Sequence, residues 1–141
     1  MQPVIQEEVT GCGIASVAAL AGVSYRVAKQ AGDSLGIRAD DPRLWSETHH
    51  VRRLLEDFGL RATPGEAPFS DWASLPSPAL LAIKWRRVNH IPFWHWVVFV
   101  RGKHGAVVLD PKATLKRNVR TDFGRMKPRW FIAVAAVAPV A

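Results

Sequence analysis

The chain has 141 residues, of which 48% are hydrophobic and 22% are charged, and its formal net charge is +7 at pH 7. This length suits one compact domain and is short for two, so we expect residues 1–141 to form a single domain. The apolar content excludes a disordered chain, and the single cysteine excludes a disulfide framework and a cysteine-based zinc cluster. Because the sequence shows no signal peptide and no apolar run long enough to span a membrane, we expect a cytoplasmic protein.

Most of the excess positive charge lies after residue 100. A basic surface can attract nucleic acid, but the chain has neither a zinc-finger spacing nor an RNP-type strand. We therefore interpret the basic residues as a solvated face and expect no nucleic-acid partner; a nucleic-acid binder stays open as an alternative. These residues are Arg101, Lys103, Lys112, Lys116, Arg117, Arg120, Arg125, Lys127 and Arg129.

Apolar spacing and capping residues predict three helices in the first 60 residues. The first covers residues 11–21, an alanine-rich run, with Thr10 as its N-cap. The second begins after Ser24, which we expect to be its N-cap, and ends at Gly32. Gly59 stops the third helix, whose apolar residues follow a three-four spacing. These apolar residues are Val51, Leu54, Leu55 and Phe58.

Four strands are predicted after residue 60, where prolines separate short apolar runs. They cover residues 79–85, 95–101, 106–110 and 130–137. Helices followed by strands indicate an α+β domain, in which N-terminal helices pack on a C-terminal antiparallel sheet.

The lone cysteine, Cys12, falls in the first turn of the first predicted helix. Free backbone N–H groups and the positive end of the helix dipole favour a negatively charged sulfur there, and the thiolate is the nucleophilic form of cysteine. Gln6, just upstream, is a neutral donor that can reach the same site. Together with the Cys12 N–H group it provides what an oxyanion hole requires. Position alone fits a small buried core residue equally well.

The second and third predicted strands are joined by a short turn that pairs Arg101 with Ala106. Counting back along both strands, Val97 then lies opposite Asp110. Side chains alternate along a strand, so His95 shares a face with Asp110 and is its diagonal neighbour, roughly 7–8 Å away by backbone. A carboxylate in that position can hold one imidazole nitrogen and orient the other toward a nucleophile. Taken singly, His95 also fits a core histidine, and Asp110 also fits a turn residue.

Neither a metal nor a cofactor is expected. His49 and His50 are adjacent, but neighbouring helical residues point in different directions and no further ligand is close in the sequence. We interpret both as solvated histidines near the start of a helix.

Several short motifs follow one another along the chain: Gln6, Cys12-Gly13, Gly22-Val23-Ser24-Tyr25, Leu75-Pro76-Ser77-Pro78-Ala79, His95-Trp96-Val97-Val98-Phe99 and Leu109-Asp110-Pro111. Their order resembles that of the bacteriocin-processing peptidases, papain-like cysteine peptidases that cut peptide leaders after a double glycine. The resemblance covers nearly the whole chain. It departs from the family at Gly11, where an acidic residue is common, and in the longer stretch 84–94.

This resemblance implies a papain-like fold with a catalytic triad of Cys12, His95 and Asp110, and with Gln6 in the oxyanion hole. The implied activity is hydrolysis of a peptide bond in a peptide or protein substrate, including leader-peptide processing. Many relatives are fused to a transmembrane exporter, so a separate partner transporter stays open. Two other functions also stay open: a non-catalytic peptide-binding domain of the same fold, and a thiol acyltransferase or deamidase with the same triad.

Overall fold

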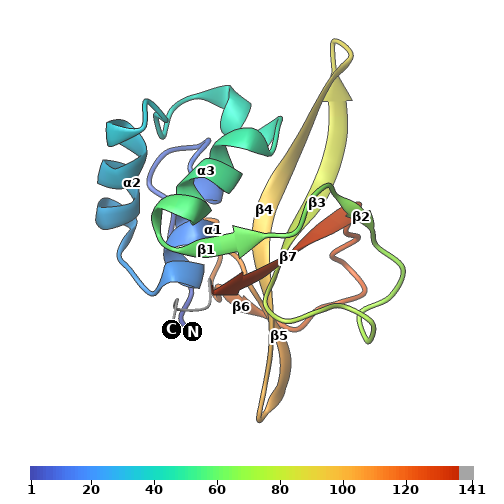
Figure 1. Cartoon of the computed structure of the whole chain (residues 1–141). Helices are drawn as coiled ribbons and strands as arrows, with labels where there is room; N and C mark the ends of the chain where they lie inside the picture. The colour runs from blue at the N-terminus through green and yellow to red at the C-terminus, as the bar shows by residue number, and fades with distance from the viewer. Residues whose placement is uncertain (137–141) are drawn as a thin grey trace.

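The computed structural model describes residues 1–136, in which helices gather on one side of an antiparallel sheet (Figure 1). The predicted α+β class is confirmed. No helix within the described part is both long and apolar enough to cross a membrane. The helices are α1 (Cys12–Ala21), α2 (Tyr25–Ser34), the short 3-10 helix η1 (Pro42–Trp45) and α3 (His49–Asp57).

Seven strands in the described residues pair in the order β1-β7-β3-β4-β5-β6, with β2 also paired to β7. All four predicted strands are present, and three very short strands were not predicted. Val137, predicted to end the last strand, lies outside the described residues. The strands are β1 (Leu60–Ala62), β2 (Ala67–Pro68), β3 (Ala79–Val88), β4 (Ile91–Gly102), β5 (Gly105–Leu109), β6 (Val119–Arg120) and β7 (Trp130–Ala136).

Helix α1 lies against β4 and is buried from Cys12 to Ala19. Its small side chains permit this close approach. The predicted span is confirmed, but the predicted cap is wrong: Gly11 is the N-cap, because the Thr10 hydroxyl donates a hydrogen bond to the carbonyl of Ala39 instead.

Helix α2 begins as predicted, with the Ser24 hydroxyl accepting a hydrogen bond from the N–H of Val27 at 3.1 Å. It does not end at Gly32. That glycine lies inside the helix, where a Cβ atom would come within 2.9 Å of the Ile37 carbonyl oxygen. Gly32 therefore allows the following segment to pack against the helix. Helix α3, by contrast, is followed as predicted by Gly59, whose φ of +73° suits glycine.

Strands β3 and β4 form an arm that extends beyond the rest of the sheet (Figure 1). Its two-residue turn, Asn89 and His90, has positive φ at both positions, as the common hairpin turns require. The pairing of the two strands shifts between Ile83 and Arg86, which marks a β-bulge, and Lys84 within the bulge has φ of +54°. The stretch 84–94 therefore lengthens a hairpin. Sequence pattern missed this because both faces of its outer end are exposed.

The sheet separates two apolar clusters. Trp94, Trp96 and Val98 of β4 belong to the cluster that the helices cover, and Val97 and Phe99 belong to a second cluster. The predicted register is confirmed, because Arg101 pairs with Ala106 and Phe99 with Val108. These pairings determine how His95, in β4, lies relative to Asp110, which directly follows β5.

Because α1 packs closely on β4, one added methyl group at Gly13 should lower the stability of the fold. A Cβ atom at Gly13 would lie 2.9 Å from Val51 Cγ2 and 3.2 Å from Trp96 Cδ1, both in buried side chains. Overpacking costs about 1–3 kcal/mol, whereas the better helix propensity of alanine returns only about 1 kcal/mol. We expect Gly13→Ala to lower the free energy of unfolding in urea by about 1 kcal/mol or more.

Gly124→Ala is the matched control, because no heavy atom lies within 4 Å of the position that its Cβ would take. A Gly13→Ala variant as stable as the wild type would contradict this packing.

Candidate active site

Cys12 lies in the first turn of α1, as predicted, at the junction of the helix with β4. Its sulfur accepts a hydrogen bond from the backbone N–H of Trp96, with 3.5 Å between N and Sγ. The residue has no exposed surface. Cys12 is therefore placed beside the strand that carries His95, but beneath the surface.

The predicted contact between His95 and Asp110 is present. Nε2 of His95 lies 2.7 Å from Oδ1 of Asp110. The carboxylate is completely buried, and 12% of the His95 side chain is exposed. The hairpin register therefore brings together two residues that are 15 positions apart in the sequence.

Cys12 also lies close to His95, because its sulfur accepts the N–H of Trp96, the next residue of β4, and it is one of the groups that shift the pKa of the ring. Because Asp110 occupies Nε2, the nitrogen left for the sulfur is Nδ1. Burial on its own would lower the pKa of His95, but the hydrogen bond with Asp110, the neighbouring Cys12 sulfur and the charge of Asp110 outweigh it and raise this pKa to about 9. The imidazole is therefore protonated at neutral pH and lies between two acidic groups.

Asp110 is held by more than His95. Its Oδ1 also accepts the backbone N–H of Lys112 at 3.0 Å, and its Oδ2 accepts Nη1 of Arg120 at 2.9 Å. Burial would raise the pKa of Asp110, but the hydrogen bond and charge of His95, followed by these two donors, lower it to about 2. The buried carboxylate is therefore ionised and its position is fixed from three directions.

Arg120 is a site residue that sequence reasoning missed. It was interpreted as part of a solvated basic face, yet only 17% of its side chain is exposed. Its guanidinium donates two hydrogen bonds to the Asp122 carboxylate, from Nη2 at 2.7 Å and from Nε at 3.0 Å. It lies on β6, beside Val108 of β5. A two-residue strand has no alternation to detect, so no pattern in the sequence indicated this pairing.

Gln6 lies in the loop before α1, and its backbone N–H donates to the Pro111 carbonyl at 2.9 Å, next to Asp110. Its side-chain Nε2 donates to the carbonyls of Glu8 and Val9, both at 3.0 Å. Both amide hydrogens are thus engaged, and Oε1 is buried with no partner among residues 1–136. To act in an oxyanion hole, this amide must release one of the two carbonyls.

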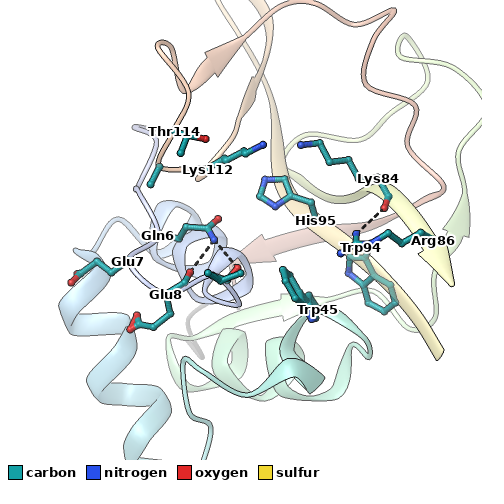
Figure 2. A pocket seen from close by; sticks show the side chains of 12 residues that line it. Gln6, Glu7, Glu8, Trp45, Lys84, Arg86, Trp94, His95, Lys112 and Thr114 are labelled. Atoms are coloured by element: carbon teal, nitrogen blue, oxygen red, sulfur yellow. Dashed lines mark hydrogen bonds between the residues drawn. The ribbon is translucent and has the colours of Figure 1, made fainter. Parts of the chain in front are cut away.

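A cavity of about 350 Å³ opens beside His95 (Figure 2). His95 and Gln6 line it, whereas Cys12 does not. Acidic residues lie on the side of Gln6, whereas Lys84 and Arg86 lie across the cavity, and Lys112 comes from the segment that is bonded to Gln6 (Figure 2). The remaining lining residues are Glu7, Glu8, Val9, Trp45, Trp94, Ala113 and Thr114.

Of the two adjacent histidines near the start of α3, His49 is solvated as predicted and His50 is not. His49 is exposed as predicted, but only 12% of the His50 side chain is exposed, so the prediction that it is solvated is wrong. It packs close to Asp41 and Glu47, with nitrogen–oxygen distances of 4.0 Å. No three His, Cys, Asp or Glu side chains gather as metal ligands within residues 1–136.

No family model matches the sequence, and a search of curated proteins finds no match. A functional assignment therefore depends on the geometry described above.

The raised pKa of His95 predicts how stability changes with pH. The folded state binds the His95 proton more tightly than the unfolded chain, whose histidine pKa is near 6.5. This contribution is fully present below about pH 6.5 and is lost as the pH rises to about 9. We expect the free energy of unfolding, measured in urea, to fall by up to about 3 kcal/mol across this window.

Asp110→Asn removes the charge that favours the protonated ring, so its stability should fall less steeply over the same window. Asp122→Asn is the control, because it leaves the bond between His95 and Asp110 intact and should keep the wild-type slope. If stability falls equally steeply with pH in the wild type and in Asp110→Asn, Asp110 is not the cause of the raised His95 pKa.

Proposed function

We propose that this protein is a papain-like cysteine peptidase that hydrolyses a peptide bond. The observation that supports this function best is the position of His95, which is bonded to Asp110 and directly precedes Trp96, whose N–H binds the Cys12 sulfur. A nucleophile, a base and a group that orients the base are the three parts of such a catalytic site. The papain-like fold is part of the proposal and rests on the order of motifs and on a helix bearing the cysteine packed on a sheet bearing the histidine.

In the proposed reaction His95 takes the proton from Cys12 on Nδ1, and the sulfur attacks the carbonyl carbon of the substrate. His95 then donates that proton to the leaving amine as the carbon–nitrogen bond breaks, which leaves a thioester on Cys12. Water attacks the thioester while His95 takes a proton from it, and the carboxylic acid is released with the thiol restored. Asp110 stays ionised and keeps the ring oriented throughout.

The negative charge that forms on the carbonyl oxygen needs donors. The backbone N–H of Cys12 and the Gln6 amide are the proposed pair. Two movements are required, because Cys12 has no exposed surface and both hydrogens of the Gln6 amide are engaged. Substrate binding in the cavity must open a path to the sulfur and turn the Gln6 amide away from Glu8 or Val9.

The same two observations favour a second function, a peptide-binding domain of this fold that does no chemistry. A binding domain needs neither an accessible Cys12 sulfur nor a free Gln6 amide, so the observed burial and hydrogen bonding are compatible with it. The proposed substrate in either case is a peptide or protein segment. Processing of double-glycine leaders for a partner transporter is the form of this proposal that the family resemblance suggests.

Hydrolysis of a mixed peptide library, followed by mass spectrometry, separates the two functions. We expect the wild type to cleave peptides and Cys12→Ala to cleave none, because no other residue in the site supplies a sulfur nucleophile. Cys12→Ala should still bind the same peptides. Binding without cleavage by the wild type would support the peptide-binding domain, and equal cleavage by both proteins would end the proposal of a cysteine peptidase.

Gln6 has its own test, a comparison of kcat for the best library peptide. Gln6→Ala should lower kcat by on the order of 100-fold, because one oxyanion donor is lost. Gln2→Ala is the control on an exposed glutamine of the same segment. If kcat is unchanged in Gln6→Ala, the side chain only braces the loop through its bonds to Glu8 and Val9.

A further inference from the structure

Two lysines converge on the cavity beside His95. Lys84 comes from β3 and Lys112 from the segment after β5, and both line the cavity. Figure 2 shows their amino groups extending toward each other above the His95 ring. Burial and then the neighbouring Lys112 ammonium lower the pKa of Lys84, as expected for two like charges held close together.

The backbone ties each lysine to a residue of the candidate site. Lys84 directly follows Ile83, which pairs with His95 across the β3–β4 ladder. It lies in the bulge with φ of +54°, a conformation that is unfavourable for any residue with a side chain. Lys112 is held by its own N–H, which donates to Asp110 Oδ1 at 3.0 Å. The backbone of each lysine is therefore fixed relative to the candidate site, and the Lys84 side chain is exposed at the edge of the cavity.

Neither of these two positive charges is in an ion pair within residues 1–136. Within residues 1–136, no carboxylate oxygen lies within 4.0 Å of either ammonium group. The nearby carboxylate, Asp110, is fully engaged by His95, Lys112 N–H and Arg120. Glu8, which lines the opposite side of the cavity, is paired with Lys29 at 2.7 Å. An anion that enters the cavity would relieve the repulsion between the lysines.

We propose that Lys84 and Lys112 bind a carboxylate of the substrate on the leaving-group side of the cleaved bond. This inference rests on the proposed peptidase function. His95 must donate its proton to the leaving amine, so the residue that carries this amine lies beside His95, where the two lysines are. The anions that a peptide carries are its C-terminal carboxylate and the side chains of aspartate and glutamate. The lysine pair would thus select peptides with an acid just after the cleavage point.

Direct binding tests this site without turnover. The probes are three peptides: acetyl-Ala-Ala-Ala with a free C-terminus, the same peptide as its amide, and acetyl-Ala-Glu-Ala amide. Their binding to the Cys12→Ser variant is followed by NMR of the lysine side chains. We expect the signals of Lys84 and Lys112 to move with the free acid, with the glutamate peptide, or with both, and not with the neutral amide. The acid that binds identifies which carboxylate is recognised.

Lys84→Gln and Lys112→Gln should each weaken binding of that acid about tenfold or more, the loss expected for one charge-assisted hydrogen bond. Lys103→Gln is the matched control, an exposed lysine in the turn between β4 and β5, and should bind like the parent. Binding of the neutral amide should be the same in all variants. Equal binding of acid and amide, no binding of any probe, or acid binding unaffected in both lysine variants would overturn the inference.

Hydrolysis of matched library peptides separates this inference from the peptidase proposal. Selective acid binding without any cleavage would keep the carboxylate site and reject the peptidase. Cleavage that depends on Cys12 but shows no preference for acids, with kcat/KM unchanged in both lysine variants, would keep the peptidase and reject the carboxylate site.

Discussion

The interaction on which the site depends is the hydrogen bond between the imidazole of His95 and the buried carboxylate of Asp110. An ionised carboxylate without water is costly unless every oxygen is paired. Here His95 and the Lys112 N–H bind one oxygen and Arg120 binds the other. Removing any one of these partners leaves a charge that the remaining structure cannot solvate.

The same carboxylate position joins segments that are far apart in the sequence. The backbone N–H of Asp110 donates to the Asn118 carbonyl, and the Asn118 amide donates back to the Asp110 carbonyl, both at 2.7 Å. The N-terminal segment reaches the neighbouring Pro111 through the backbone N–H of Gln6. The loop that precedes Cys12 and the hairpin that carries His95 are thus fixed to one point, which sets the position of α1 relative to the ring.

Some of this arrangement could be predicted because it depends on local rules. A short turn fixes the register of a hairpin, and strand alternation then places His95 and Asp110 on one face. An alanine-rich run without proline predicted α1, and apolar periodicity predicted α3. The position of Cys12 in the first turn followed from the helix start, although its cap was wrong because Thr10 bonds to Ala39 instead.

Other parts depend on tertiary contacts that leave no pattern in the sequence. Arg120 is placed by a strand of two residues, which pairs with β5, and by the buried carboxylate of Asp110 just beyond β5. Lys84 has a left-handed backbone conformation, which the sequence does not predict for a lysine. Gly32 was predicted to end its helix because glycine often does so, but it lies inside the helix and allows the segment at Ile37 to pack closely against it. Each case is a close packing or charge contact that overrides a local preference.

Alkylation of the single cysteine by iodoacetamide, followed by intact-protein mass spectrometry, tests the central claim most directly. The claim is that His95, oriented by Asp110, governs the reactivity of Cys12 in the folded protein. Folded wild type should gain one adduct at least about tenfold faster than folded His95→Gln or Asp110→Asn, because the partner that takes the thiol proton is lost or misoriented. A folded wild type that is labelled, but no faster than either variant, would contradict the account.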